Sequence, residues 1–98
     1  MSTPNIEFIA ELETIVKARL NAGGDESYTA RLAAAGTKRI AQKVGEEGVE
    51  LALAATAGNQ REVIDEAADL VYHLVVLLAD AGLSLEDIAT HLKARHSA

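Results

Sequence analysis

Three glutamates stand close together in the segment KVGEEGVELALAATAG, residues 43–58. Glu46, Glu47 and Glu50 fall within five positions, among residues that are mostly apolar. On a helix, Glu47 and Glu50 are neighbours on the surface because they are three residues apart. Charges of one sign repel each other, and burial beside a core raises the cost of ionising them. This pattern indicates that a positive group lies among the acids.

A second acidic pair, Glu66 and Asp69, follows in the next apolar stretch with the same three-residue spacing. On a helical wheel, Glu47 and Glu66 each border the apolar stripe of their own segment. The two segments are joined by a short turn, so we expect an antiparallel helix hairpin with both acidic pairs on one seam. The carboxylates of Glu47, Glu50, Glu66 and Asp69 are therefore predicted to converge. We call these four residues the acidic seam.

A divalent cation would stabilise the acidic seam better than the nearest basic side chains, Lys43 and Arg39, one or two helical turns away. Mg²⁺ prefers oxygen ligands and is usually held by a few carboxylates together with substrate phosphates. We therefore expect an Mg²⁺ site, with Mn²⁺ as a substitute. The alternative is an ordinary solvated helix face, in which Lys43 pairs with Glu46 or Glu47 for a few tenths of a kcal/mol.

The elements that position these acids are predicted to be helices. No segment shows the strict alternation of a strand, and five segments have helical apolar spacing. The first helix is expected to begin with a cap at Thr3 and with Pro4, and to end at Gly23–Gly24. The second is expected to be capped by Ser27 or Asp25 and to end at Gly36. Long helices follow over about 37–57, with Thr37 as a cap and Gly58–Asn59 as the exit, and over about 60–81. A capping box, Ser84 to Asp87, opens the last helix.

Each long helix has an apolar stripe that we expect to face its partner. The stripes contain Ile40, Val44, Leu51 and Ala55 in the first long helix, and Val63, Ala67, Leu70, Leu74 and Ala81 in the second. The predicted fold class is therefore all-α. It is a helical bundle built on a long antiparallel hairpin with shorter flanking helices, in a single domain over 1–98.

The second long helix is apolar nearly all round between positions 70 and 79. Val71, Val75, Val76 and Leu78 lie off its main stripe. A chain of 98 residues has little material to cover every side of such a helix. We therefore expect a homodimer in which the partner chain buries these four residues.

Composition restricts the function classes. The net charge of −6 argues against nucleic-acid binding, and the lack of cysteine excludes disulfides and cysteine-based metal sites. The N-terminus lacks the pattern of a signal peptide, and the apolar run LVYHLVVLLADAG is too short to cross a bilayer. We expect a cytoplasmic protein without a membrane partner.

The segments RIAQKVGEEGVELALAA and DEAADLVYHLVVLL resemble the phosphoribosyl-ATP pyrophosphatases of histidine biosynthesis. The upstream segment SYTARLAAAGTKRI resembles that family too, so the resemblance runs from about Ser27 to the end of the chain. More broadly, the pattern E-E-x-x-E, 15 residues, then E-x-x-D is similar to that of the all-α, MazG-like nucleoside triphosphate pyrophosphohydrolases.

This resemblance implies roles for individual residues. It places the metal ligands on Glu47, Glu50, Glu66 and Asp69, and it makes Glu46 a further ligand or a water-orienting group. Catalytic roles would then fall on Glu46 and Glu47, and Arg39 and Lys43 would lie near substrate phosphates. The implied reaction is Mg²⁺-dependent hydrolysis of 1-(5-phosphoribosyl)-ATP to phosphoribosyl-AMP and pyrophosphate. Bifunctional relatives carry a cyclohydrolase domain as well, and we expect the stand-alone form here.

Two other functions remain open at this stage. A house-cleaning pyrophosphatase for deoxynucleoside triphosphates uses the same acidic motif, and the segment SYTARLAAAG favours the histidine-pathway enzyme over it. A more distant alternative is a non-enzymatic acidic helical interaction module. His73 is either a phosphate or water contact or a hydrogen-bonded structural histidine, and Tyr28 is either a packing residue or a nucleotide contact. Gly48, where the family leads us to expect alanine, is a candidate for a close helix contact.

Overall fold

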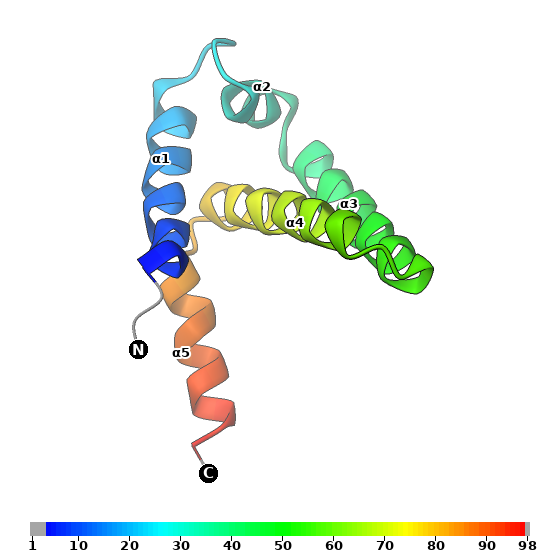
Figure 1. The fold of residues 1–98 in the computed structure, drawn as a ribbon. Helices are drawn as coiled ribbons and strands as arrows, with labels where there is room; N and C mark the ends of the chain where they lie inside the picture. Colours follow the sequence, from blue (N-terminus) through cyan, green and yellow to red (C-terminus); the bar gives the residue numbers. More distant parts are fainter. Residues whose placement is uncertain (1–3, 98) are drawn as a thin grey trace.

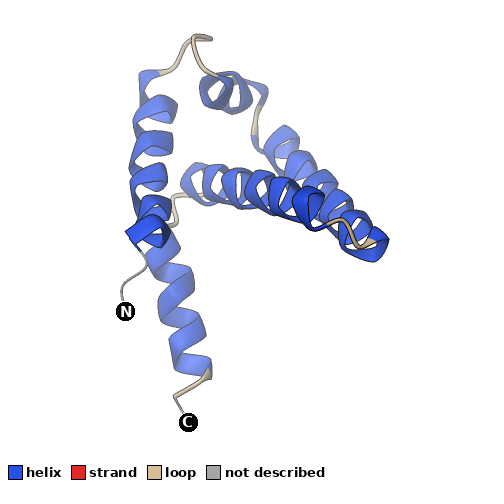
Figure 2. Cartoon of the chain, viewed as in Figure 1, coloured by secondary structure: helices blue, strands red, loops and turns tan. Residues whose placement is uncertain are grey.

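The computed structural model describes residues 4–97, and all of the regular structure in that range is helical (Figures 1 and 2). A 3₁₀ turn, Pro4–Glu7, leads into five α-helices. These are α1 (Phe8–Ala22), α2 (Tyr28–Ala35), α3 (Thr37–Ala57), α4 (Gln60–Asp80) and α5 (Leu85–Arg95). The predicted all-α fold class is confirmed. The predicted cap at Thr3 lies outside the described residues.

The hairpin of α3 and α4 is the most extensive helix pair of the fold, and the sequence at its turn explains its sharpness (Figure 1). Gly58 ends α3 in the left-handed conformation, with φ of 76°, which costs glycine nothing. Its N–H donates back to the carbonyls of Ala54 and Ala55. The next residue, Asn59, caps α4, since its side-chain oxygen accepts from the backbone N–H of Glu62 at 3.1 Å. A two-residue connection of this kind forces the helices to run antiparallel.

The caps predicted for α2 and α5 are confirmed, whereas the one predicted for α3 is wrong. Ser27 accepts from the N–H of Ala30 at 3.0 Å, and Ser84 forms the full capping box with Asp87. Thr37 is instead the first residue of α3 and caps nothing. Its hydroxyl donates to Asp80 Oδ2 at 2.7 Å, because the hairpin brings the last turn of α4 beside the start of α3.

The core lies where α1 and α2 cover the hairpin. Five buried residues make up its central cluster: Val16, Leu32, Ile40, Val75 and Val76. The face of α4 that we expected a partner chain to bury is therefore covered within the protomer. Val75, Val76 and Leu78 are only 1%, 0% and 8% exposed, and Val71 packs against the same cluster. The prediction was wrong in this respect because the all-round apolar pattern of α4 accommodates α1 on one side and α3 on another.

The predicted stripes of the hairpin are only partly buried. Ile40 and Ala54 are the buried apolar residues of α3, and most of the stripe residues named for α3 and α4 are half-buried. Ala55 and Ala81 are exposed, contrary to expectation. Ala55 stands in the last turn of α3, and Ala81 is the residue that follows the end of α4.

Helix α5 stands apart from the rest of the fold (Figure 1). None of its residues is buried. Its start is attached to α1, because Glu13 Oε2 accepts from the N–H of Leu85 at 2.6 Å. The radius of gyration is 14.7 Å, whereas a compact domain of this length has about 13 Å. The protomer is thus an open arrangement of helices.

Across residues 4–97, no single helix combines the length and the apolar character needed to span a membrane. Only α4 and α5 taken together meet those criteria of length and composition, and they are bent by 103° relative to each other.

Candidate metal site

Three carboxylates from the two long helices meet in the hairpin. Glu47 of α3 and Glu66 and Asp69 of α4 each offer an oxygen, and these oxygens all lie within 4.8 Å of one another. Glu47 faces α4 and is only 5% exposed, whereas Glu66 is half-buried and Asp69 is exposed. Because Glu66 and Asp69 are three residues apart on one helix, both project toward Glu47 across the hairpin.

Two oxygens of this group are buried without a hydrogen-bond partner. They are Glu47 Oε2 and Glu66 Oε2. Leaving a buried polar atom unpaired costs about 1–3 kcal/mol, and more if it is charged. The structure therefore concentrates negative charge at a point where the described protein atoms do not satisfy it.

The neighbouring carboxylates also affect the protonation of Glu66. Hydrogen bonding to Glu50 is the main cause that raises the pKa of Glu66 from 4.5 to about 7, and burial, the charge of Glu50 and the nearby Glu47 act in the same direction. Glu50 itself is exposed on α3 and lies outside the group of three oxygens. It therefore contributes to the acidic seam as a neighbour of Glu66, at the rim rather than at the centre.

Lys43 compensates part of this charge. Its Nζ lies 3.3 Å from Glu47 Oε1 and 3.7 Å from Glu46 Oε1. The hydrogen bond with Glu47 is the main cause that raises the pKa of Lys43 above its usual value. Glu46 also accepts from Gln42 Nε2 at 3.1 Å. The contacts that a solvated helix face would make are thus present, but they engage Oε1 of Glu47 and leave its Oε2 unpaired.

Arg39, the other basic residue named from the sequence, is exposed on α3 one turn before Lys43. It lies on the same ridge of the helix as Lys43 because the two residues are four apart. The structure therefore aligns both basic side chains along α3, with Lys43 nearer to the acids.

His73 and Tyr28 form a hydrogen-bonded pair that the sequence reasoning did not find. The Tyr28 hydroxyl and His73 Nε2 are 2.8 Å apart, and His73 Nδ1 is 2.7 Å from the backbone carbonyl of Asp69. These contacts are those expected of a hydrogen-bonded structural histidine. The two residues are 45 positions apart, so the only signal in the sequence was that each is a polar aromatic residue near the motif.

The donor set fits a hard divalent cation. All of the converging groups are carboxylates, and such oxygens are what Mg²⁺ and Mn²⁺ bind in proteins. A cation among Glu47, Glu66 and Asp69 would satisfy the two buried oxygens that lack partners. It would also remove the reason for Glu66 to keep a proton near neutral pH.

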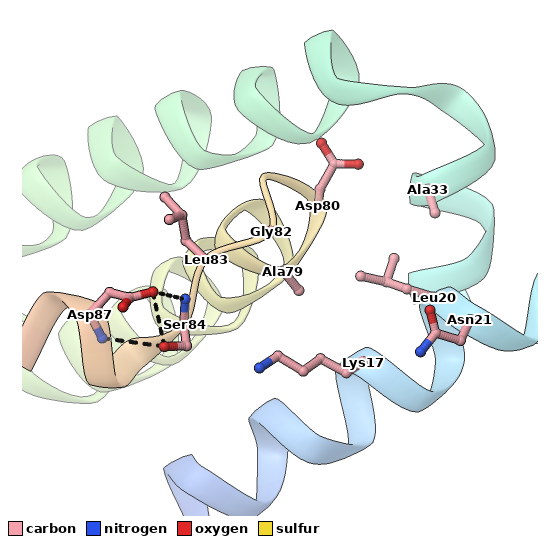
Figure 3. A pocket seen from close by; sticks show the side chains of 10 residues that line it. All are labelled: Lys17, Leu20, Asn21, Ala33, Ala79, Asp80, Gly82, Leu83, Ser84 and Asp87. Carbon is pink, nitrogen blue, oxygen red and sulfur yellow. Dashed lines mark hydrogen bonds between the residues drawn. The ribbon is translucent and has the colours of Figure 1, made fainter.

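A separate hollow of about 530 Å³ lies between α1, α2 and the turn that joins α4 to α5. Figure 3 shows its ten lining residues, with the Ser84–Asp87 capping box at one wall and Lys17 extending from α1. None of the residues predicted to bind metal or phosphate lines it. It is therefore distinct from the carboxylate group.

Comparison with known proteins shows which family the chain resembles. The model of the family described as phosphoribosyl-ATP pyrophosphohydrolase matches residues 9–96. Among curated proteins, the chain is 63% identical over 91 residues to the histidine biosynthesis bifunctional protein HisIE of Campylobacter jejuni, covering 93% of the chain and 44% of that protein. It is 60% identical to HisIE of Vibrio vulnificus, covering 91% of the chain and 42% of that protein. It is 55% identical to HisIE of Escherichia coli, covering 91% of the chain and 44% of that protein. The chain thus spans less than half the length of these relatives.

Proposed function

Because the chain belongs to the phosphoribosyl-ATP pyrophosphohydrolase family, we propose that it hydrolyses 1-(5-phosphoribosyl)-ATP between the α and β phosphates. The products are phosphoribosyl-AMP and pyrophosphate, in the second step of histidine biosynthesis. The observation that carries the proposal is the group of three carboxylates with two unpaired buried oxygens, in a chain that matches this family over residues 9–96. A soluble nucleotide substrate also favours a cytoplasmic location.

Glu47, Glu66 and Asp69 are the proposed ligands of Mg²⁺, with Glu50 at the rim. When bound, Mg²⁺ supplies charge neutralisation for phosphate oxygens and for the departing pyrophosphate. This matters in a chain with a net charge of −6, since a polyphosphate would otherwise meet an acidic surface. Mn²⁺ is expected to replace Mg²⁺, because the ligands are all oxygens.

We assign phosphate binding and activation of the attacking water to neighbouring side chains of α3. Lys43, already paired with Glu46 and Glu47, and Arg39 one turn before it are proposed to contact substrate phosphates. Glu46 and Glu47 are proposed to orient the attacking water and to take up its proton. The water oxygen then bonds to phosphorus, the phosphoanhydride bond breaks, and its electron pair leaves with pyrophosphate.

We also propose that the protein is a homodimer, although its interface differs from the one expected from sequence. Val49 and Leu53 of α3 are 60% and 64% exposed, and Ile64 of α4 is 69% exposed. Val49 also lines an open hollow of about 670 Å³ along α3, together with Gln42, Gly45, Glu46 and Glu50. An exposed apolar face of this kind, on an open protomer, favours burial by a second copy. A monomer in light scattering at micromolar concentration would contradict this proposal.

The test of the activity is pyrophosphate release from phosphoribosyl-ATP, with dATP and dCTP in parallel, each with Mg²⁺ and with EDTA. The proposal predicts release from phosphoribosyl-ATP that EDTA abolishes. Preference for a deoxynucleotide would make the protein a house-cleaning pyrophosphatase with the same metal site. No release from any substrate would contradict an enzymatic role and leave an acidic interaction module.

A further inference from the structure

Two adjacent residues of α2 hold two adjacent residues of α4 by their side chains. The Tyr28 hydroxyl bonds to His73 Nε2 at 2.8 Å, and the Thr29 hydroxyl bonds to the Tyr72 hydroxyl. The rings of Tyr28 and Tyr72 stack with centroids 6.1 Å apart, and both meet the His73 ring edge-on. The two pairs fix the first turn of α2 to the turn of α4 that follows Asp69.

The contacts of His73 determine which atom of the Tyr28 pair carries the proton. The backbone carbonyl of Asp69 can only accept, so His73 Nδ1, at 2.7 Å from it, is the donor. In the neutral imidazole, Nε2 is then a bare acceptor. The hydroxyl proton of Tyr28 must therefore point to His73.

This assignment gives the Tyr28 oxygen an unusual character. Its proton is committed to a histidine that is only 5% exposed, while its lone pairs remain available as acceptors. Tyr28 is 40% exposed, in contrast to Thr29, which is fully buried. Tyr28 is also connected to the acidic seam, because its partner His73 stands one helical turn after Asp69 and bonds to the Asp69 backbone carbonyl.

We propose that Tyr28 is a substrate-positioning residue whose phenolic oxygen accepts a hydrogen bond from a ribose hydroxyl of the nucleotide. Phosphate oxygens are acceptors, so a phenol whose proton is committed to His73 offers them nothing. A ribose hydroxyl is a donor and is complementary to it. Tyr28 thus recognises the sugar part of the substrate, while the acids and Lys43 act on the phosphates. This inference rests on the proposed function.

The test compares two ligands that differ in hydroxyl groups. Phosphoribosyl-AMP carries ribose hydroxyls, whereas pyrophosphate has none, and both reach the acidic seam through phosphate. Dissociation constants are measured by calorimetry in the presence of Mg²⁺ for the wild type, for Tyr28→Phe and for Tyr72→Phe. Tyr28→Phe keeps the ring stack and removes only the oxygen. Tyr72→Phe removes the hydroxyl from the neighbouring pair, whose partner Thr29 is buried.

Tyr28→Phe is expected to weaken phosphoribosyl-AMP binding roughly tenfold, because one hydrogen bond to the ribose is lost. Pyrophosphate binding should remain unchanged. The KM for phosphoribosyl-ATP should rise more than kcat falls. Tyr72→Phe should lower the melting temperature and change neither dissociation constant.

Equal binding of phosphoribosyl-AMP by wild type and Tyr28→Phe would overturn the assignment alone. Equal weakening of both ligands would overturn it as well, because that pattern indicates a disturbed acidic seam. A wild type that binds neither ligand would contradict the proposed function and this inference with it.

Discussion

The raised pKa of Glu66 predicts how the affinity of the acidic seam for Mg²⁺ changes with pH. This pKa of about 7 means that most molecules carry a proton on Glu66 at pH 6 and few do at pH 8. A cation ligand must lose that proton, so the proton and Mg²⁺ compete for the same carboxylate. The apparent dissociation constant is multiplied by 1 + 10^(7−pH), which is about 11 at pH 6 and about 1.1 at pH 8. Mg²⁺ should therefore bind about tenfold more tightly at pH 8 than at pH 6.

The assay is calorimetric titration with Mg²⁺ at pH 6, 7 and 8. Glu66→Gln should weaken binding and remove this tenfold slope, because the competing proton is lost with the carboxylate. Asp65→Asn is the matched control, since Asp65 is the exposed neighbour on α4 and lies outside the carboxylate group. Equal affinity of the wild type for Mg²⁺ at pH 6 and pH 8 would contradict the competition between Mg²⁺ and the proton of Glu66. So would a Glu66→Gln variant that keeps the wild-type affinity and slope.

The same shift has a consequence for stability in EDTA. The folded-state pKa of Glu66 lies above its unfolded value of 4.5, so the folded chain holds more protons between pH 4.5 and about 7. The contribution of Glu66 to stability is fully present below pH 4.5 and is lost as the pH rises through 7. The melting temperature of the wild type relative to Glu66→Gln should therefore fall over that range. A difference that rises with pH would contradict the assigned pKa shift.

Three further substitutions test the fold. Gly48→Ala should stabilise the folded protein by about 1 kcal/mol and raise its melting temperature by roughly 4–8 °C. The reason is that Gly48 is helical and an added Cβ meets no atom within 4 Å. An unchanged melting temperature would contradict this. Val76→Ala should lower the free energy of unfolding in denaturant by about 2 kcal/mol, since Val76 is fully buried in the core cluster. A cost near zero would contradict the burial of Val76. Ser84→Ala should lower the free energy of unfolding by about 1 kcal/mol and speed amide hydrogen exchange in the first turn of α5, because it removes the capping box. Unchanged exchange would show that the capping box is dispensable.

The hairpin was predictable because its signals are local. Apolar spacing sets the two helices, and Gly58 and Asn59 mark the turn by residue type alone. The meeting of Glu47, Glu66 and Asp69 then follows from helix geometry, since short-range spacing and an antiparallel turn decide which side chains face each other. A helical wheel does not distinguish a buried acid from its exposed neighbour, however. Glu47 is buried and Glu50 is at the rim, a difference that depends on how α3 and α4 pack.

Features that join distant parts of the chain were not predictable in the same way. The apolar face of α4 with Val75 and Val76 was correctly identified as one that needs cover, but the pattern did not reveal that α1 supplies it. The Thr37–Asp80 bond and the Tyr28–His73 pair each span more than 40 residues, and only packing brings their members together. Gly48, a candidate for a close helix contact, has open space around it, so no contact explains the glycine.

We propose that the acidic seam holds a divalent cation between α3 and α4. Anomalous diffraction from crystals grown with Mn²⁺ tests it most directly, because the ion is located independently of activity. One or more anomalous peaks are expected within coordination distance, roughly 2–2.3 Å, of the carboxylate oxygens of Glu47, Glu66 and Asp69. A map in which these carboxylates hold no ion at saturating Mn²⁺, or in which the ion lies elsewhere on the chain, would contradict it.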